Sequence, residues 1–251
     1  MHRFYLTPTL CKDGSLLLSE RDSHHARHVL RVKEGERVIV LDGAGGELLC
    51  EVKKPESSRL RLAVTQRSDI PPLPYQITLL QAVPKGKIIE NIIQKAAELG
   101  AHRIVPLLSD RVVAHLDDEG AAARGERWQI TAIEAIKQCG SAWLPQVEAP
   151  LAPREYLARG EKFELGLVAS LQSDGRHPRE HFNAFHQEHG RMPKSVCVWV
   201  GPEGDFTPAE MNAIKSAGSL PITLGRLVLR SETAAVYCLS VINYELQSPR
   251  R

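Results

Sequence analysis

The sequence predicts an α/β fold in which a small β-rich domain precedes a larger domain built on a parallel sheet. From residue 75 onward, apolar strand-like runs alternate with amphipathic helical runs, which is the pattern of a largely parallel sheet. The first 70 residues instead show short strand patterns, which favour a small β-barrel. Between them, Pro71-Pro72-Leu73-Pro74 cannot continue a helix or a central strand. We therefore expect domains at 1–70 and 75–251, joined by a proline-rich linker at 71–74.

Short strands with one buried face are expected in the first domain. Residues 36–42 form an apolar run that is typical of a strand. Further along, Leu60, Leu62 and Val64 alternate with more polar residues, as in a half-buried strand. Ahead of residues 36–42 we expect a short helix that begins with Ser23 as its N-cap.

Two segments resemble phosphate-binding loops only superficially. The run Gly43-Ala44-Gly45-Gly46 follows a strand, but more strand pattern comes next instead of the helix that such a loop needs. A hairpin turn is the better interpretation of these glycines. The segment Pro84-Lys85-Gly86-Lys87 lacks the upstream glycine and the Ser/Thr of a P-loop, so we reject that interpretation as well.

The second domain alternates strands and helices along the chain. Helix 87–99 places isoleucines and alanines on one face and stops at Gly100, and helix 126–139 stops at Gly140. Such alternation predicts parallel strands whose carboxyl ends meet at one edge of a sheet. The expected strands are 76–82, 103–108, 164–170, 195–200 and 220–223.

The composition is that of an ordinary globular protein. Of the 251 residues, 43% are hydrophobic and 25% are charged, which excludes a disordered chain, a collagen and a coiled coil. The net charge of +2 excludes a histone-like polycation but leaves room for a local basic face. Residues 1–33 hold six basic and three acidic side chains together with four histidines, so we expect that face there.

The start of the chain and its cysteines favour a cytoplasmic protein without a membrane anchor. The first residues contain no apolar signal-peptide core, and the longest apolar runs are far shorter than the roughly 20 residues of a membrane span. The five cysteines form no CxxC pair, which favours a reducing cytosol. His24 and His28 are four residues apart, but no third ligand is evident, so we expect no metal site.

The strongest candidate site follows the strand 195–200. Gly201-Pro202-Glu203-Gly204 leaves this strand, and Thr207, Pro208 and Glu210 then provide an N-cap, a first helical residue and a capping box. The glycines therefore lie at the carboxyl end of a parallel strand, where α/β sheets bind ligands. An ordinary tight connection is the alternative, but two glycines around a carboxylate favour a functional loop.

A second glycine-bearing loop follows the next strand. Leu224-Gly225 leads through Arg230 to Ser231-Glu232-Thr233-Ala234, which opens a helix that reaches about residue 246. We expect Ser231 to be the N-cap, with Glu232 near the positive end of the helix. Arg230 pairing only with Glu232 is the structural alternative. Two such loops at neighbouring strand ends predict a pocket shared between them.

These segments resemble the SPOUT methyltransferases, and specifically the ribosomal RNA small subunit methyltransferase E family. The resemblance covers nearly the whole chain, and its last two segments are highly specific together. The matching segments are His2–Tyr5, His24-His25 with His28–Arg31, Lys95–Gly100, Glu134-Ala135 with Gln138, Gly201–Gly204, and Leu224-Gly225 with Leu229–Ala234.

The resemblance implies a trefoil-knot methyltransferase domain with an N-terminal PUA-like β-barrel that helps to hold RNA. It implies a homodimer whose cofactor pockets lie near the subunit interface. It also implies that backbone groups of three loops bind S-adenosylmethionine (SAM). The residues expected to bind this cofactor are Val168, Leu171, Gly201, Pro202, Glu203, Gly204, Leu224, Gly225, Leu229, Ser231, Thr233 and Ala234.

The family's reaction is methylation of uridine N3 in 16S ribosomal RNA of the small subunit. Methyl transfer from a sulfonium is an in-line displacement, and uridine N3 must lose its proton. We expect Arg230 to stabilise negative charge on the uracil, and Glu203 or Glu232 to orient the base or accept the proton. A structural ion pair of Arg230 is the alternative.

The target uridine is expected to be unstacked, because a paired N3 is inaccessible. Candidate RNA contacts in the barrel are Arg3, Lys12, His24, Arg27, Arg31 and Lys33. Two other functions stay open. One is ribose 2'-O-methylation by the same fold, and the other is a non-catalytic RNA-binding factor in ribosome assembly.

Overall fold

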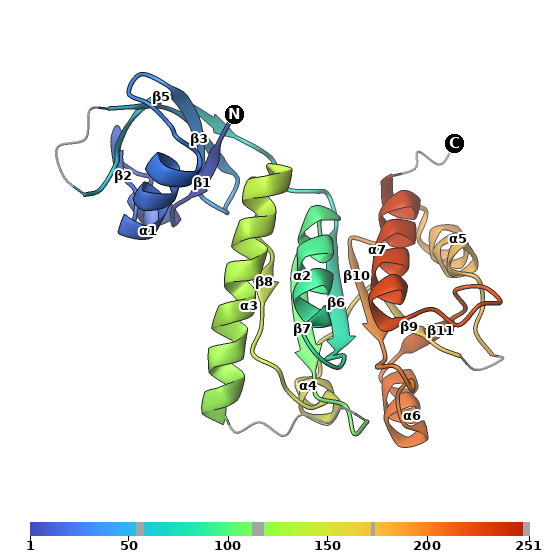
Figure 1. Cartoon of the computed structure of the whole chain (residues 1–251). Helices are drawn as coiled ribbons and strands as arrows, with labels where there is room; N and C mark the ends of the chain where they lie inside the picture. The colour runs from blue at the N-terminus through green and yellow to red at the C-terminus, as the bar shows by residue number, and fades with distance from the viewer. Residues whose placement is uncertain (54–57, 112–117, 172–173, 248–251) are drawn as a thin grey trace. The chain divides into compact units, whose positions relative to one another are not determined.

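The computed structural model describes residues 1–53, 58–111, 118–171 and 174–247 (Figure 1). The described chain separates into two compact units. The first holds Met1–Pro72 together with Ile133–Leu144, and the second holds Leu73–Ala132 together with the chain from Pro145 onward. The division falls inside the proline-rich segment 71–74. Helix α3 (Asp118–Cys139) contributes its last turns to the first unit.

The first unit is a five-stranded sheet that curls into a half-barrel (Figure 1). The strand order is β1-β3-β4-β5-β2, with β1 parallel to β3 and every other pair antiparallel. Its concave face buries an apolar core that includes Phe4, Leu16, Val38 and Leu62. The strands are β1 (Arg3–Tyr5), β2 (Ser15–Leu17), β3 (Arg37–Leu41), β4 (Gly46–Val52) and β5 (Arg61–Asp69).

The glycine-rich segment between β3 and β4 is a hairpin turn, as the sequence predicts. Asp42 Oδ1 accepts hydrogen bonds of 2.8 Å from the backbone N–H groups of Ala44 and Gly46. Gly43 and Gly45 adopt positive φ angles of 75° and 101°, which favour glycine. The carboxylate that follows the strand therefore closes the turn, and no helix N-terminus follows it.

The short helix of this unit begins earlier than the sequence predicts. Helix α1 (Glu20–His24) is capped by Ser19, whose hydroxyl accepts a 3.0 Å hydrogen bond from Asp22 N–H. Ser23 is not the cap. It is fully buried, and its hydroxyl accepts a 2.8 Å hydrogen bond from Leu60 N–H. The prediction of Ser23 was wrong because Ser19 offered the same capping chemistry four residues upstream.

Helix α1 continues into a π-helical turn and then a sharp change of direction. The turn η2 (His25–Val29) is closed by a 3.0 Å hydrogen bond from Leu30 N–H to the carbonyl of His25. Arg31 follows with a φ of 56°, an uncommon value for a residue with a side chain. A separate 3-10 turn, η1 (Pro8–Leu10), lies between β1 and β2.

The second unit is built on a six-stranded sheet in which all neighbours are parallel. The strand order is β11-β9-β10-β6-β7-β8. Strands β6 and β10 match the residues predicted from the sequence, and β7, β9 and β11 differ by one residue at one or both ends. The strands are β6 (Gln76–Ala82), β7 (Arg103–Leu107), β8 (Gln146–Val147), β9 (Leu165–Ala169), β10 (Ser195–Val200) and β11 (Ser219–Ile222).

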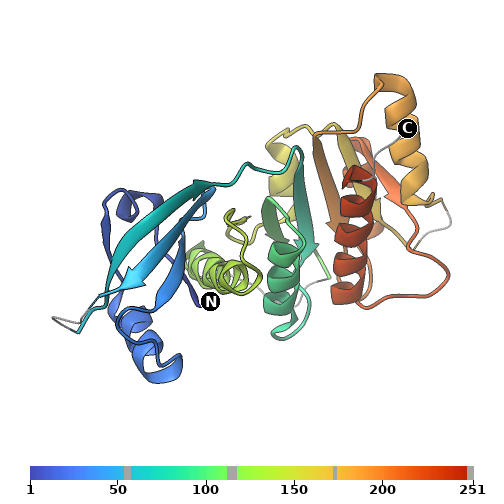
Figure 2. The same cartoon turned by 90° about the horizontal axis from the view of Figure 1, so that it is seen from above.

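Helices cover both faces of this sheet. Helices α2 and α7 pack side by side over one face, and α5 lies beside α7 (Figures 1 and 2). Helices α4 and α6 cover the other face, where Tyr156, Trp199 and Met211 belong to one apolar cluster. Among the described residues, no helix is long and apolar enough to cross a membrane. The helices are α2 (Ile88–Glu98), α4 (Pro153–Ala158), α5 (Pro178–His189), α6 (Pro208–Ser216) and α7 (Ser231–Gln247).

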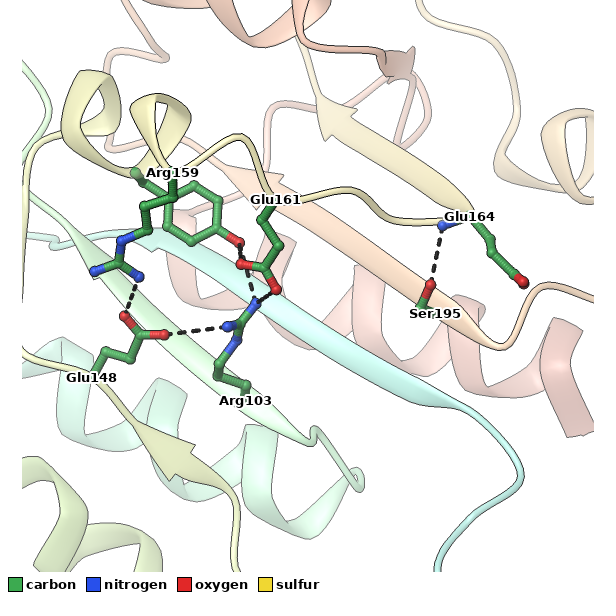
Figure 3. A network of polar contacts seen from close by, with 7 residues as sticks. Arg103, Glu148, Arg159, Glu161, Glu164 and Ser195 are labelled. Atoms are coloured by element: carbon green, nitrogen blue, oxygen red, sulfur yellow. Dashed lines mark hydrogen bonds and ion pairs between the residues drawn. The ribbon is translucent and has the colours of Figure 1, made fainter.

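A polar network joins segments near the amino ends of the strands (Figure 3). Arg103, the first residue of β7, forms ion pairs with Glu148 at 3.4 Å and with Glu161. Arg159 pairs with Glu148 at 2.7 Å, and the Tyr156 hydroxyl donates a 2.8 Å hydrogen bond to Glu161. This network therefore lies away from the cavity described next, which is at the carboxyl edge of the sheet.

Candidate functional site

Three loops at the carboxyl ends of β9, β10 and β11 enclose a cavity of about 180 Å³. We call it the three-loop cavity. The first loop leaves β9 at Ala169, the second leaves β10 at Val200, and the third runs from Thr223 to the start of α7. Its walls are formed by Ala169, Ser170, Leu171, Val200, Gly201, Pro202, Glu203, Asp205, Thr223, Leu224, Gly225, Arg226, Leu227, Val228, Leu229, Ser231 and Ala234.

The second loop is tightly folded and needs glycine at its start. A Cβ on Gly201 would lie 3.0 Å from Asp205 Oδ1 and 3.1 Å from the backbone nitrogen of Phe206. The capping box that follows is present as predicted, because Thr207 Oγ1 accepts from Glu210 N–H at 3.3 Å and Glu210 Oε2 accepts from Thr207 N–H at 2.9 Å. The loop is therefore anchored to the first turn of α6.

The third loop turns at Gly225, which has a φ of 107°. Thr223 Oγ1 accepts a 3.2 Å hydrogen bond from Gly225 N–H and so braces this turn. Gly225 lines the cavity with its backbone, and the exposed side chains of Leu227 and Val228 follow it on the rim. The loop therefore presents backbone groups and apolar side chains to the cavity.

Ser231 connects the third loop to the second. Its hydroxyl donates a 2.9 Å hydrogen bond to the Gly201 carbonyl and accepts one of 2.9 Å from the side-chain amide of Gln81. The prediction of Ser231 as N-cap is therefore corrected. Helix α7 already begins at Ser231, and the Arg230 carbonyl accepts the first helical hydrogen bond, from Ala234 N–H. The hydroxyl instead serves to join the two loops.

The structure brings together most of the residues expected to bind a cofactor. Three of them lie outside the wall of the cavity: Val168 is fully buried in β9, whereas Gly204 and Thr233 are exposed. The other predicted residues do line the cavity, and they are Leu171, Gly201, Pro202, Glu203, Leu224, Gly225, Leu229, Ser231 and Ala234.

The three residues expected to act on the substrate lie in different places. Glu203 is exposed on the wall of the cavity, and its carboxylate accepts a 3.2 Å hydrogen bond from Lys85 N–H. Arg230 is exposed and Glu232 is half-buried at the start of α7, next to the wall residue Ser231 but outside the wall itself. In the described chain, no ion pair joins Arg230 to Glu232, so the alternative of a structural pair lacks support.

Sequence reasoning missed several residues at this edge of the sheet. Asp205 lines the cavity directly after the glycine loop, and Arg226 lines it directly after Gly225. Arg111, which follows β7, donates a hydrogen bond to the Gly204 carbonyl. Lys85 belongs to the segment that was rejected as a P-loop, and that segment contacts Glu203 through its backbone. All four residues lie within a few positions of the carboxyl end of a parallel strand, and this position is the sequence feature that could have identified them.

The candidate RNA contacts all belong to the first unit. Lys12, His24, Arg31 and Lys33 are exposed, and the rings of His24 and His28 lie 4.4 Å apart. Arg27 is half-buried. Within the described ranges, His, Cys, Asp and Glu side chains form no cluster that could hold a metal ion.

Arg3 is engaged in hydrogen bonds within the first unit. Its guanidinium donates hydrogen bonds of 3.4 Å and 3.1 Å to the carbonyls of Lys137 and Gln138. These carbonyls belong to the last turn of α3, where a cation is favourable to the helix dipole. Arg3 thus holds the end of α3 against β1.

Comparison with known proteins agrees with this architecture. A family described as the RNA methyltransferase domain matches residues 71–243, and an RNA methyltransferase PUA domain matches residues 18–64. A protein of Bacillus subtilis named ribosomal RNA small subunit methyltransferase E is 31% identical over 92% of this chain and 90% of its own length.

Two solved structures share the fold of the whole chain. A putative methyltransferase from Legionella pneumophila, solved with the cofactor SAM bound, is 29% identical with a TM-score of 0.84, and 96% of each chain is covered. A ribosomal RNA small subunit methyltransferase E from Neisseria gonorrhoeae, bound to SAM, is 28% identical with a TM-score of 0.82 and the same coverage. On the length and identity of these matches, this chain belongs to the ribosomal RNA small subunit methyltransferase E family.

Proposed function

We propose that this protein transfers a methyl group from SAM to N3 of a uridine in 16S ribosomal RNA of the small subunit. The observation that carries the proposal is the three-loop cavity at the carboxyl edge of a parallel sheet. It occurs in a chain whose structural relatives from Legionella pneumophila and Neisseria gonorrhoeae were solved with SAM bound.

The residues of the three-loop cavity fit SAM chemically. Leu171, Leu224 and Leu229 provide apolar side chains against which an adenine ring packs favourably. Backbone groups of Gly201 and Gly225 are accessible without a side chain in front of them, and they suit the polar edges of adenine and ribose. Two carboxylates on the wall suit a ligand with a net positive charge. These residues would hold the cofactor.

When bound, SAM supplies an electrophilic methyl group on its sulfonium. The protein must hold the uracil in line with that methyl group and remove the N3 proton. Glu203 is an exposed carboxylate on the wall and is suited to accept the proton, and Glu232 is a further carboxylate at the start of α7. The exposed guanidinium of Arg230 is suited to stabilise negative charge on the uracil oxygens.

The first unit is proposed to hold the RNA. Lys12, Arg31 and Lys33 are exposed cations on a half-barrel that matches a PUA domain of RNA methyltransferases. Cations that contact phosphates release counterions, so RNA affinity is expected to fall steeply as salt concentration rises. Binding of a 16S fragment measured by fluorescence anisotropy at several salt concentrations tests this. An affinity that is independent of salt would contradict the basic surface.

The protein is further proposed to act as a homodimer, on rRNA within the small subunit, in the cytoplasm where ribosomes assemble. Leu227 and Val228 on the rim of the cavity are 79% and 75% exposed, and Tyr237 on α7 is 40% exposed. Exposed apolar groups of this kind suit a protein interface. Sedimentation equilibrium of the wild type and of Val228→Asp tests the dimer, because a charge at a buried interface should favour the monomer.

Nucleoside mass spectrometry of 16S rRNA tests the reaction. N3-methyluridine should be present in cells that contain the protein, absent when its gene is deleted, and restored in vitro by purified protein, SAM and purified small subunits. A 2'-O-methylnucleoside would indicate the ribose reaction, and no change in any nucleoside would indicate a non-catalytic assembly factor. In Arg230→Ala, methyl transfer should fall sharply while SAM affinity is kept. Unchanged turnover would remove Arg230 from the mechanism.

A further inference from the structure

Asp205 has an unusual backbone conformation on the wall of the three-loop cavity. Its φ is 63°, a left-handed value that costs a residue with a Cβ roughly 1 kcal/mol and is best tolerated by Gly, Asn and Asp. Such strain is retained where the surrounding structure holds it, and it clusters at binding sites. At Asp205, the side chain and a neighbouring arginine both hold the conformation.

The carboxylate of Asp205 joins two of the three loops. Oδ1 accepts a 2.8 Å hydrogen bond from Phe206 N–H, and Oδ2 accepts one of 3.2 Å from Leu171 N–H. Leu171 belongs to the first loop, whereas Asp205 belongs to the glycine-rich second loop. On the other side of the loop, the guanidinium of Arg111 donates to the Gly204 carbonyl and, at 3.5 Å, to that of Asp205. The Asp205 carboxylate is thus held in position by hydrogen bonds from two backbone N–H groups, those of Phe206 and Leu171.

The wall of the cavity carries more negatively charged side chains than positively charged ones. Two carboxylates, Glu203 and Asp205, and one guanidinium, Arg226, line it. Glu203 and Arg226 are exposed, whereas Asp205 is half-buried. A fixed, half-buried charge interacts more strongly with a ligand than an exposed and solvated one. Asp205 therefore contributes the best-placed negative charge of the cavity.

The methyl donor and its product differ in charge. SAM carries a sulfonium, an ammonium and a carboxylate, and so has a net charge of about +1, whereas S-adenosylhomocysteine has lost the sulfonium charge. We propose that Asp205 is a specificity-determining residue that makes the cavity prefer the cationic donor over the neutral product. The inference rests on the proposed function, because it takes SAM as the ligand. It adds a role in product release. After methyl transfer, S-adenosylhomocysteine has no sulfonium to attract the Asp205 carboxylate, so the product binds less tightly than SAM.

Two substitutions separate the charge from the backbone strain. Asp205→Asn tolerates the left-handed backbone and keeps one acceptor oxygen, but it removes the charge. Asp205→Gly removes the charge and both hydrogen bonds, but it relieves the strain. Asp110→Asn is the matched control, because it removes one exposed carboxylate near the same edge of the sheet without touching the wall of the cavity.

Isothermal titration calorimetry with SAM and with S-adenosylhomocysteine is the test. In Asp205→Asn, the dissociation constant for SAM should rise about tenfold and that for the product by no more than about threefold. Asp205→Gly should weaken both ligands, and more so SAM, without a fall in the thermal unfolding temperature of the ligand-free protein. Asp110→Asn should bind both ligands as the wild type does.

The outcomes distinguish this inference from the function on which it rests. A wild-type protein that binds neither ligand contradicts the proposed function. A wild type that binds both, with equal losses for SAM and product in Asp205→Asn, overturns the charge preference and leaves the carboxylate as a bridge between loops. Unchanged dissociation constants in both Asp205 variants overturn both roles of this residue.

Discussion

The side-chain amide of Gln81 donates a 2.9 Å hydrogen bond to the hydroxyl of Ser231, across 150 positions of the chain. Gln81 is fully buried at the end of β6, and its amide also donates to the Ala82 carbonyl at 2.8 Å. The Ser231 hydroxyl in turn donates a 2.9 Å hydrogen bond to the Gly201 carbonyl. This buried relay connects a central strand, the first residue of α7 and the second loop of the cavity.

Removal of the Ser231 hydroxyl should loosen the three-loop cavity. In Ser231→Ala, the buried amide of Gln81 and the Gly201 carbonyl each lose a partner, which is expected to cost about 1–3 kcal/mol of the free energy of unfolding. SAM affinity should fall as well, because the second and third loops lose their direct link. Urea denaturation and calorimetry measure the two effects. Ser240→Ala, an exposed position on the same helix, should change neither, and equal stability of the two variants would show that the relay contributes little.

Much of the second unit could be predicted from the sequence because its signals are local. Strand 195–200 is apolar from Val196 onward, and strand 76–82 is apolar at Ile77, Leu79, Leu80 and Ala82, as expected for strands buried on both faces. The capping box at Thr207 and Glu210 and the stop at Gly100 depend on residues within one turn of the helix end. The two glycine loops followed from the rule that parallel strands end at a common edge.

What could not be predicted depends on long-range contacts. Ser23 and Ser231 both resemble caps locally, but their hydroxyls bind Leu60 N–H and the Gly201 carbonyl, partners that only the fold brings near. Asp205 carries no signal in the sequence beyond its place after Gly204, since its role depends on Leu171 arriving from another strand. Arg3 carries the charge of an RNA contact, yet it binds the end of α3.

The ion-pair network at the amino ends of the strands is expected to contribute more to stability than an exposed ion pair. Arg103 and Glu148 are 17% and 12% exposed. Arg103→Met should leave Glu161 without a cation and Glu148 with Arg159 alone, and it should cost about 2–3 kcal/mol. Arg127→Met is the control, because Arg127 is 61% exposed and pairs with Glu90 at the surface, where about 0–1 kcal/mol is expected. Urea denaturation measures both. Equal losses of unfolding free energy in the two variants would mean that the partly buried network stabilises the protein no more than the surface pair does.

Acid should weaken the contact between Glu164 and Arg191. Hydrogen bonds of 2.7 and 2.8 Å from Arg191, and one of 2.6 Å from Lys194 N–H, lower the pKa of Glu164 from 4.5 to about 2. Because the folded pKa is lower than the unfolded one, this stabilisation is present above about pH 4.5 and is lost as the pH falls towards about 2. Glu164 is partly exposed, so the effect is expected to be modest.

Glu164→Gln tests the acid effect through its pH profile. The free energy of unfolding of this variant should depend less on pH between about 4.5 and 2 than that of the wild type. The backbone N–H of Glu164 donates to Ser195 Oγ at 3.1 Å, a contact that the substitution leaves in place (Figure 3). Glu188→Gln, at an exposed position on α5, should keep the wild-type profile. Parallel profiles for the Glu164 variant and the wild type would contradict the lowered pKa.

Cys139 should be the reactive thiol of the folded protein. It is exposed at the end of α3, whereas the other four cysteines are buried. Burial raises the pKa of Cys11 and Cys50 to about 11 and that of Cys197 and Cys238 to about 12, so their nucleophilic thiolate forms are scarce near neutral pH. Titration with a disulfide reagent should therefore modify one thiol rapidly in the native protein and all five in denaturant. Cys139→Ser should abolish the rapid phase, and a second fast thiol in that variant would show that one of the apolar cores opens on the timescale of the reaction.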